Sequence, residues 1–164
     1  MGNFRTNREK LDSEGRNLFS RDCLEVNVEK NGKTLHLYVN HFKSMREGRP
    51  QTRARRETQA RCVAEILDKK HAKNNYLENF VVLGDFNDYL EPGHALGPLV
   101  DHPELVNVTN RLHPDHRWTH YWNSGNEYHQ IDFMLVSRFL AEAKDNKDTN
   151  PEIVRTGCPY RASL

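Results

Sequence analysis

A short polar sequence, Gly84-Asp85-Phe86-Asn87, directly follows the apolar run Phe80–Leu83. An unbroken apolar run of this length predicts a strand covered on both faces, so the polar groups would lie where that strand ends. Asp85 and Asn87 are two residues apart and would face the same way in extended chain. A carboxylate can bind a hard cation or polarise a water molecule, and a neighbouring amide can hold a phosphoryl oxygen. The pattern suits metal-assisted hydrolysis of a phosphate ester, although Gly, Asp and Asn are also typical of a plain turn.

Two further positions could supply chemistry. His41 ends an alternating apolar segment and is followed by Lys43, so both side chains could contact an anion. A surface histidine beside a solvated lysine is the plainer interpretation. Asp132 lies inside the apolar run Ile131–Val136, where an unpaired carboxylate is costly. It could orient a His or Arg, as the acid of a hydrolytic triad does, or protect a sheet edge from pairing.

Charged and metal-ligating residues also form two looser clusters. Arginines are concentrated between residues 46 and 61 and could meet phosphates, but the glutamates among them favour a solvated helix face. His113, His116 and His120 have the spacing of possible metal ligands. Pro114 between them and the absence of a paired cysteine motif argue against a zinc site.

The composition excludes several classes of protein. The 164 residues include 24 Lys and Arg against 23 Asp and Glu, and a net charge of +1 argues against binding nucleic acid by bulk charge. The mean hydropathy is −0.89, and no stretch approaches the ~20 apolar residues of a membrane helix. Three cysteines, Cys23, Cys62 and Cys158, are too few and too scattered for a disulfide framework. The first residues lack the apolar core of a signal peptide, which favours a cytoplasmic location.

Periodicity indicates the elements that must position these residues. Alternating apolar residues over 24–28 and 35–39, with Asn31-Gly32 between them, predict a hairpin. An apolar stripe at helical spacing predicts a helix over about 53–73.

Further along the chain, a second hairpin is expected to pair 118–122 with 128–136, and a last strand to start near Ile153. Residues 1–20 are polar and expected to be poorly ordered. We expect a single domain over 1–164, of the α/β (α+β) class in a layered sandwich.

Taken in order, these segments resemble the endonuclease/exonuclease/phosphatase superfamily, which includes deoxyribonuclease I. The resemblance rests on Val39–Ser44, Val82–Asn87 and Gln130–Ser137. It implies a four-layer sandwich of two sheets flanked by helices. It also implies cleavage of phosphoester bonds with Mg²⁺ or Mn²⁺. The Arg46–Arg56 segment and the aromatic strand Trp118–Trp122 favour a nucleic acid or another polyanion as the phosphoester substrate.

The same resemblance implies a role for each candidate residue. Asp85 would bind the metal and activate the attacking water. Asn87 would help to hold the metal, orient that water or bind phosphate. His41 would stabilise the phosphoryl oxygens, and Asp132 would orient a catalytic imidazole.

The chain also departs from the family pattern. Family members begin with strands that carry an Asn and a metal-ligating Glu, and end with Ser-Asp-His. Here the matching strands start after both, and Ser163 is followed by Leu164. We therefore expect an incomplete domain with little activity of its own, because groups that act as a unit are strongly non-additive. The alternatives are a non-catalytic remnant that acts as a binding or interaction module, and a site completed by self-association through exposed sheet edges.

Overall fold

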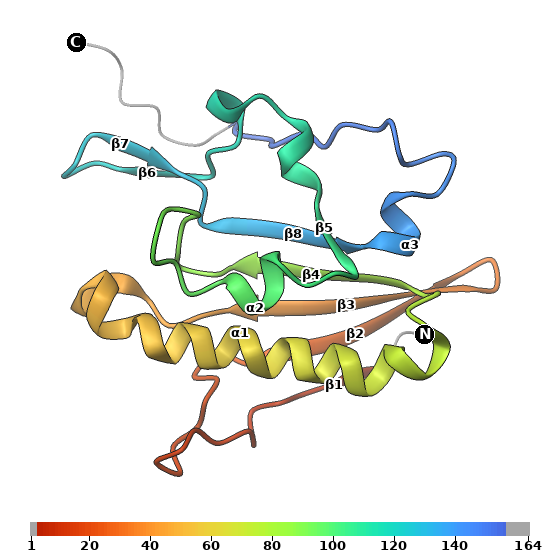
Figure 1. Cartoon of the computed structure of the whole chain (residues 1–164), viewed down its shortest axis with the longest axis horizontal. Coiled ribbons are helices and arrows are strands. Elements are labelled where there is room, and N and C mark those ends of the chain that lie inside the picture. The colour runs from red at the N-terminus through yellow and green to blue at the C-terminus, as the bar shows by residue number, and fades with distance from the viewer. Residues whose placement is uncertain (1–2, 157–164) are drawn as a thin grey trace.

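Six strands form one sheet, in the order β1-β2-β3-β4-β8-β5, in a computed structural model that describes residues 3–156. The strands are β1 Phe4–Arg5, β2 Cys23–Lys30, β3 Lys33–His41, β4 Asn79–Asp85, β5 Leu105–Asn107 and β8 Asp132–Ser137. Only β3 and β4 are parallel neighbours. Two shorter strands, β6 His120–Trp122 and β7 Glu127–His129, form a separate hairpin that projects beyond the large sheet (Figure 1).

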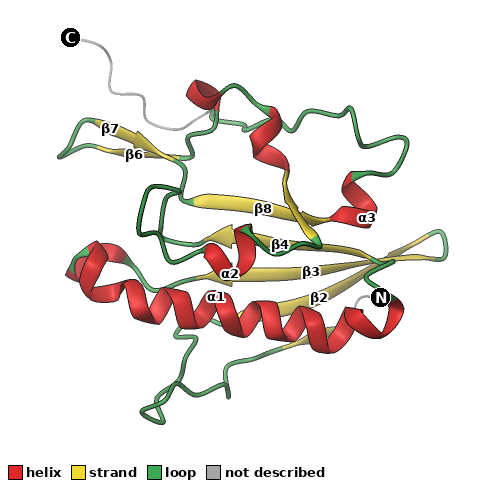
Figure 2. Ribbon diagram, in the orientation of Figure 1, coloured by secondary structure: helices red, strands yellow, loops and turns green. Residues whose placement is uncertain are grey.

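The long helix α1 (Arg49–His71) and the short α2 (Gly97–Val100) lie on one side of this sheet (Figure 2), and the short α3 (Arg138–Ala141) packs against the other face. Turns of 3₁₀ helix lie at Met45–Glu47, Ala72–Asn74, Val108–Arg111 and Pro114–His116. The segment β3–α1–β4 is a crossover between parallel strands, and it brings the ends of β3 and β4 to the same edge. The expected mixed α+β class is confirmed. Residues 3–156 form one large sheet with one helical layer, and no second large sheet.

The first hairpin is confirmed by the pairing of β2 with β3 over their whole length. Asn31 and Gly32 turn the chain with φ of 52° and 72°, the left-handed conformation that both residues tolerate well. Helix α1 starts at Arg49, earlier than the sequence predicted. Pro50 fits its first turn, because a proline there removes an N–H that has no partner within the helix.

The main core lies between α1 and the sheet. Ala60, Val63 and Leu67 of α1 pack with Tyr38, Phe80, Val82 and Leu135 of the strands, all with exposed fractions of 0%. The other face of the sheet is covered only in part, by a smaller cluster of Val81, Val108, Val136 and Ala141. Val39 and Met134 on this face are 38% and 45% exposed.

Three predicted elements differ from the structure. The second arm of the predicted 118–136 hairpin divides at Gln130, and β8 leaves β6 to pair with β4 and β5 because its apolar residues are buried there. Residues 151–156 hold no strand, although one was expected near Ile153. Residues 3–20, for which little order was expected, include β1 and bury Leu18 and Phe19 in the core. The segment Cys158–Leu164, with Ser163, lies outside the described residues.

Candidate active site

His41, Asp85 and Asp132 occupy one row across three adjacent strands. His41 is paired with Asp85 in the parallel ladder of β3 and β4, and Asp85 is paired with Asp132 in the antiparallel ladder of β4 and β8. Paired residues of neighbouring strands project from the same face of a sheet. Tyr38 faces α1, and side chains alternate along a strand, so the row lies on the opposite face. We call these three residues the edge row.

Asn87 joins the edge row through the sharp turn that follows β4. Its backbone has a φ of 49°, and its N–H donates to Asp85 Oδ1 at 2.8 Å. Its side-chain Nδ2 donates to the carbonyl of Phe42 at 3.2 Å. The amide oxygen Oδ1 is left without a partner among residues 3–156, so it remains available to a ligand. All four residues predicted from the sequence are therefore brought together.

Aromatic rings fix the chain beneath the edge row. Phe42 stacks on Phe86 with centroids 4.9 Å apart, and Phe86 stacks on Phe133 at 5.4 Å. The N–H of Phe42 donates to the carbonyl of Asp85 at 2.9 Å, and that of Phe86 to the carbonyl of Ile131 at 2.8 Å. Strand ends that are bonded and buried in this way hold their side chains in defined positions.

His41 contacts both a carboxylate and a guanidinium group. Its Nε2 is 3.4 Å from Asp85 Oδ2 and 2.6 Å from Arg21 Nη1. Because an arginine N–H can only donate, His41 Nε2 accepts from Arg21 in this arrangement. Arg21 therefore adds a permanent positive charge to this end of the row, which suits an anionic substrate.

Asp132 is held through its backbone by Thr119. The hydroxyl oxygen of Thr119 accepts from the N–H of Ile131 at 3.1 Å and from that of Asp132 at 3.0 Å. Gln130 Nε2 donates to the carbonyl of Asp132 at 3.3 Å and to Thr109 Oγ1 at 2.9 Å. These bonds fix the point at which the chain passes from the β6–β7 hairpin into β8.

The electrostatics of Asp85 reflect its neighbours. Burial raises the pKa of this carboxyl above its ordinary value, and the nearby carboxylate of Asp132 raises it further. The N–H of Asn87 and electrostatic interactions with His41 and His120 act in the opposite direction without cancelling the rise. A cation between two such carboxylates would favour their charged forms.

The oxygen atoms at this edge of the sheet are chemically suited to bind a hard divalent cation. Asp85, Asp132 and the free amide oxygen of Asn87 are oxygen donors, and Mg²⁺ is commonly held by one or two carboxylates with water and phosphate completing its shell. Within residues 3–156, however, no three His, Cys, Asp or Glu side chains are grouped closely enough to hold a metal by themselves. The fit is therefore to a cation that shares its ligands with solvent or substrate.

The arginine cluster divides: Arg53 and Arg61 are exposed beside Glu57 on the solvated helix face that the sequence favoured, whereas Arg49 and Arg56 form a partly buried network with Asp88. Arg56 is fully buried, and its Nε lies 3.3 Å from Asp88 Oδ2. Arg49 donates through Nε to Asp88 Oδ1 at 2.6 Å, and Asp88 also accepts from the N–H of Ala95. Burial favours the neutral acid, but these donors outweigh it and lower the pKa of Asp88. This network fastens the start of α1 to the turn after β4.

Three residues near the edge row were not singled out from the sequence for this site. Arg21 lies in a segment without a distinctive local pattern, and Thr119 lies in a predicted hairpin strand whose pattern gives no sign of a role at the site. His120 belonged to the predicted histidine spacing, and its charge acts on Asp85 instead. His113 and His116 are ring neighbours with centroids 6.0 Å apart.

Comparison with known proteins adds a family and a set of folds. The family model described as Endonuclease/Exonuclease/phosphatase family matches residues 3–150. No curated protein matches the sequence. No helix within residues 3–156 is both long and apolar enough to cross a membrane.

Solved structures of similar fold include three that cover most of this chain. Truncated Caenorhabditis elegans TDP2 is 15% identical with a TM-score of 0.58, and the match covers 82% of this chain and 51% of the TDP2 chain. The human Nocturnin catalytic domain, with bound sulfate, is 17% identical with a TM-score of 0.57, and the match covers 83% of this chain and 47% of the Nocturnin chain. D. rerio TDP2 complexed with a single-strand DNA product is 14% identical with a TM-score of 0.55, and the match covers 82% of this chain and 52% of the TDP2 chain. The chain thus spans about half the length of these structures, and such identities show likeness of fold alone.

Proposed function

Because the chain belongs to the endonuclease/exonuclease/phosphatase family, we propose that its edge row and Asn87 bind a phosphoester and a divalent cation, Mg²⁺ or Mn²⁺, for hydrolysis. The observation that supports this most strongly is the register of His41, Asp85 and Asp132. These residues are far apart in the sequence but lie side by side at the ends of three adjacent strands, on the same face of the sheet. A plain turn at Gly84–Asn87 would require no such alignment.

Each residue has a role that its contacts allow. Asp85 and the amide oxygen of Asn87 hold the cation, which when bound neutralises charge on the phosphoryl group. Asp85 also accepts the proton of an attacking water. Arg21 and His41 hold phosphoryl oxygens, and Asp132 fixes an imidazole or the cation opposite Asp85.

We further propose that hydrolysis by residues 3–156 alone is weak. Within the described part of the chain no three His, Cys, Asp or Glu side chains are grouped closely enough to hold a metal by themselves, so Asp85, Asp132 and Asn87 share the cation with water and substrate. The same observation supports the second candidate, a module that binds a phosphoester without cleaving it.

The proposed substrate is a polyanion such as single-stranded nucleic acid. The aromatic β6–β7 hairpin adjoins Asp132 and exposes Trp122 and Tyr128 by 50% and 57%. Exposed rings beside a phosphate site suit the stacking of bases. A solved structure of D. rerio TDP2 holds a single-strand DNA product, and its fold is similar.

One experiment separates the two candidates. The purified 164-residue chain is titrated with Mg²⁺ and Mn²⁺ by NMR, and its hydrolysis of a chromogenic phosphodiester is measured in parallel. Metal-dependent shifts at Asp85 and Asn87 with slow, metal-dependent turnover support the hydrolase. Phosphodiester binding without any turnover supports the binding module. If neither metal nor phosphodiester perturbs the edge row, the proposed function is wrong.

A further inference from the structure

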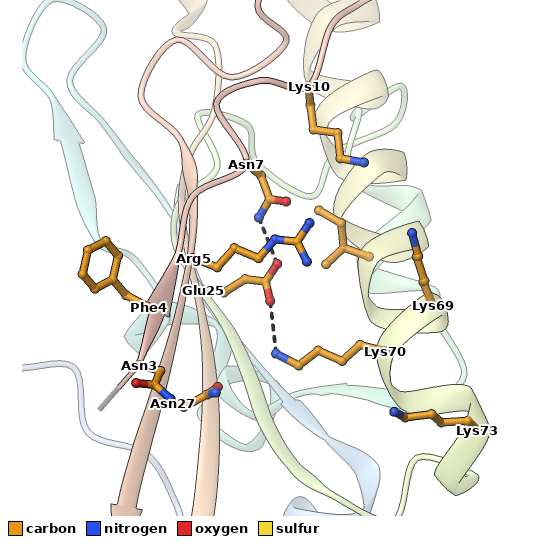
Figure 3. Close-up of a pocket in the computed structure, with 11 residues that line it drawn as sticks. Asn3, Phe4, Arg5, Asn7, Lys10, Glu25, Asn27, Lys69, Lys70 and Lys73 are labelled. Atoms are coloured by element: carbon orange, nitrogen blue, oxygen red, sulfur yellow. Dashed lines mark hydrogen bonds and ion pairs between the residues drawn. The ribbon is translucent and has the colours of Figure 1, made fainter. Parts of the chain in front are cut away.

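A cavity of about 400 Å³ lies on the other side of the sheet from the edge row. Its walls are the segment around β1, the strand β2 and the last turns of α1 (Figure 3). Glu25 on β2 pairs with Tyr38 and faces α1 with it, whereas the edge row faces away from α1. The volume falls in the usual range for small-molecule sites, about 300–1,000 Å³.

The cavity is strongly basic. Among the described residues that line it are the cations Arg5, Lys10, Lys69, Lys70 and Lys73, and Glu25 is the sole acid of that set. Lys70 Nζ lies 3.1 Å from Glu25 Oε2, so these two charges neutralise each other. Burial opposes ionisation of Glu25, but hydrogen bonds from Asn7 and Lys70 outweigh it and lower its pKa. The remaining four cations form no ion pair with any residue of 3–156.

The end of α1 explains only part of this charge. Lys69 and Lys70 lie in the last turn of α1, where cations commonly stabilise a helix through its dipole. Arg5 and Lys10 come from a different segment, and Figure 3 shows that the side chains of both extend toward α1. Like charges from separate segments repel one another around a cavity unless an anion lies between them.

A buried acceptor in the same cavity also lacks a partner. Asn7 is 1% exposed, and its Nδ2 donates to the carbonyl of Cys23 at 2.9 Å and to Glu25 Oε1 at 3.0 Å. These two bonds fix the orientation of the amide. Its Oδ1 has no hydrogen-bond partner among residues 3–156. Buried polar atoms are nearly always hydrogen-bonded, so this oxygen calls for a donor from outside the described chain.

We propose that this cavity binds a small phosphorylated polyol, such as a sugar phosphate. The phosphate lies among Arg5, Lys69 and Lys73, and a hydroxyl group of the ligand donates to Asn7 Oδ1. The site lies on the far face of the sheet, so the proposal does not depend on the function of the edge row. Cations alone would accept any anion, whereas Asn7 adds a preference for an anion that carries a hydroxyl group.

Calorimetry and NMR on the 164-residue chain test the proposal with three probes: ribose 5-phosphate, inorganic phosphate and ribose. We expect ribose 5-phosphate to bind more tightly than inorganic phosphate, ribose not to bind at millimolar concentration, and the amide signals of Asn7, Lys69 and Lys73 to shift. Failure of ribose 5-phosphate to bind would overturn the proposal. Equal affinity for inorganic phosphate would overturn the role of Asn7.

Charge-reversal variants locate the site. The double variant Lys69→Glu/Lys73→Glu should weaken ribose 5-phosphate by about tenfold or more, because two charge-assisted contacts are lost. The control Lys144→Glu/Lys147→Glu makes the same change of net charge at exposed positions outside the cavity, and should change the affinity less than twofold. Circular dichroism confirms that both variants fold. Equal weakening in both, or binding of a single-stranded DNA oligonucleotide but not of ribose 5-phosphate, would contradict the assignment.

Discussion

Asp132 lies directly opposite Asp85 in the antiparallel ladder of β4 and β8, although 46 residues separate them in the sequence. Two facing carboxylates are unfavourable unless something positive lies between them. Burial and then the charge of Asp132 hold the pKa of Asp85 above its ordinary value. Without a cation or a proton, the two charged carboxylates are therefore less favourable than an uncharged pair would be at these positions. Unfavourable charge pairs of this kind are typical of functional sites.

The variant Asp85→Asn should weaken metal binding without lowering the stability of the fold. At pH 7 the folded state disfavours the charged form of Asp85, so a neutral amide of similar size should leave the melting temperature equal to or above that of the parent. The response to Mg²⁺ should fall by about tenfold or more, because a charged ligand is lost. NMR titration and thermal denaturation measure both quantities. Asp145→Asn, at an exposed position, is the matched control and should change neither.

Gly84→Ala should be strongly destabilising. Gly84 has a φ of 130°, and a Cβ there would overlap the backbone carbonyl oxygen of Asn40 on β3. We expect a loss of about 3 kcal/mol or more, measured by urea denaturation, from strain and clash together. Gly93→Ala is the control: its φ is 83°, but no atom lies within 4 Å of the added Cβ. It should cost only about 1–2 kcal/mol, and similar losses in the two variants would show that the close approach of β3 and β4 is not what requires Gly84.

Asp88→Asn should leave a buried charge without its partner. Arg56 and Asp88 have exposed side-chain fractions of 0%, and removal of one member of a buried pair typically costs about 3–5 kcal/mol. Denaturant unfolding should show a loss of that order. Arg53→Gln breaks a long contact with Glu57 at the surface, where the side chain of Arg53 is 50% exposed. Its effect should stay within about 0.5 kcal/mol, and a loss as large as that of Asp88→Asn would argue against burial as the cause.

His71 should make stability depend on pH near neutrality. Burial lowers its pKa below the ordinary value of 6.5, despite the opposing carboxylate of Glu78. A neutral ring explains both contacts: Nδ1–H donates to Glu78 Oε2 at 2.5 Å, and Nε2 accepts from Tyr38 Oη–H at 2.7 Å. The unfolded chain therefore binds a proton at a higher pH than the folded one does. Stability is fully present above about pH 6.5 and falls as the pH drops through the interval below it.

Thermal denaturation between pH 8 and 5, with an NMR titration of the His71 ring, tests this dependence. A ring that titrates above its ordinary value, or stability that rises as the pH falls from 7 to 6, would contradict the neutral assignment. The variant Tyr38→Phe keeps the aromatic packing and removes the O–H that donates to His71 Nε2. It should raise the His71 pKa, because the neutral ring then loses a hydrogen bond.

Local patterns in the sequence determined the first hairpin, the long helix and the strand that ends in Asp85. Each depends on residues close together in the chain: the alternation in 24–28 and 35–39, the turn at Asn31-Gly32, and the helical spacing of Ala60, Val63 and Leu67. The resemblance to a known family added His41 and Asp132 to Asp85 and Asn87 as one site. The structure brings these four residues together, and their chemical roles remain predictions.

Tertiary structure alone decided the rest. Whether residues 132–137 pair with the hairpin before them or with β4 depends on which partner buries more apolar surface, and the hydrophobic pattern fits both. The burial of Arg56 depends on Asp88, a residue 32 positions away. The contact of Arg21 with His41 and the basic cavity at Asn7 likewise arise where separate segments meet. Burial and ion pairing between distant residues depend on how the whole chain packs, and no local periodicity contains that information.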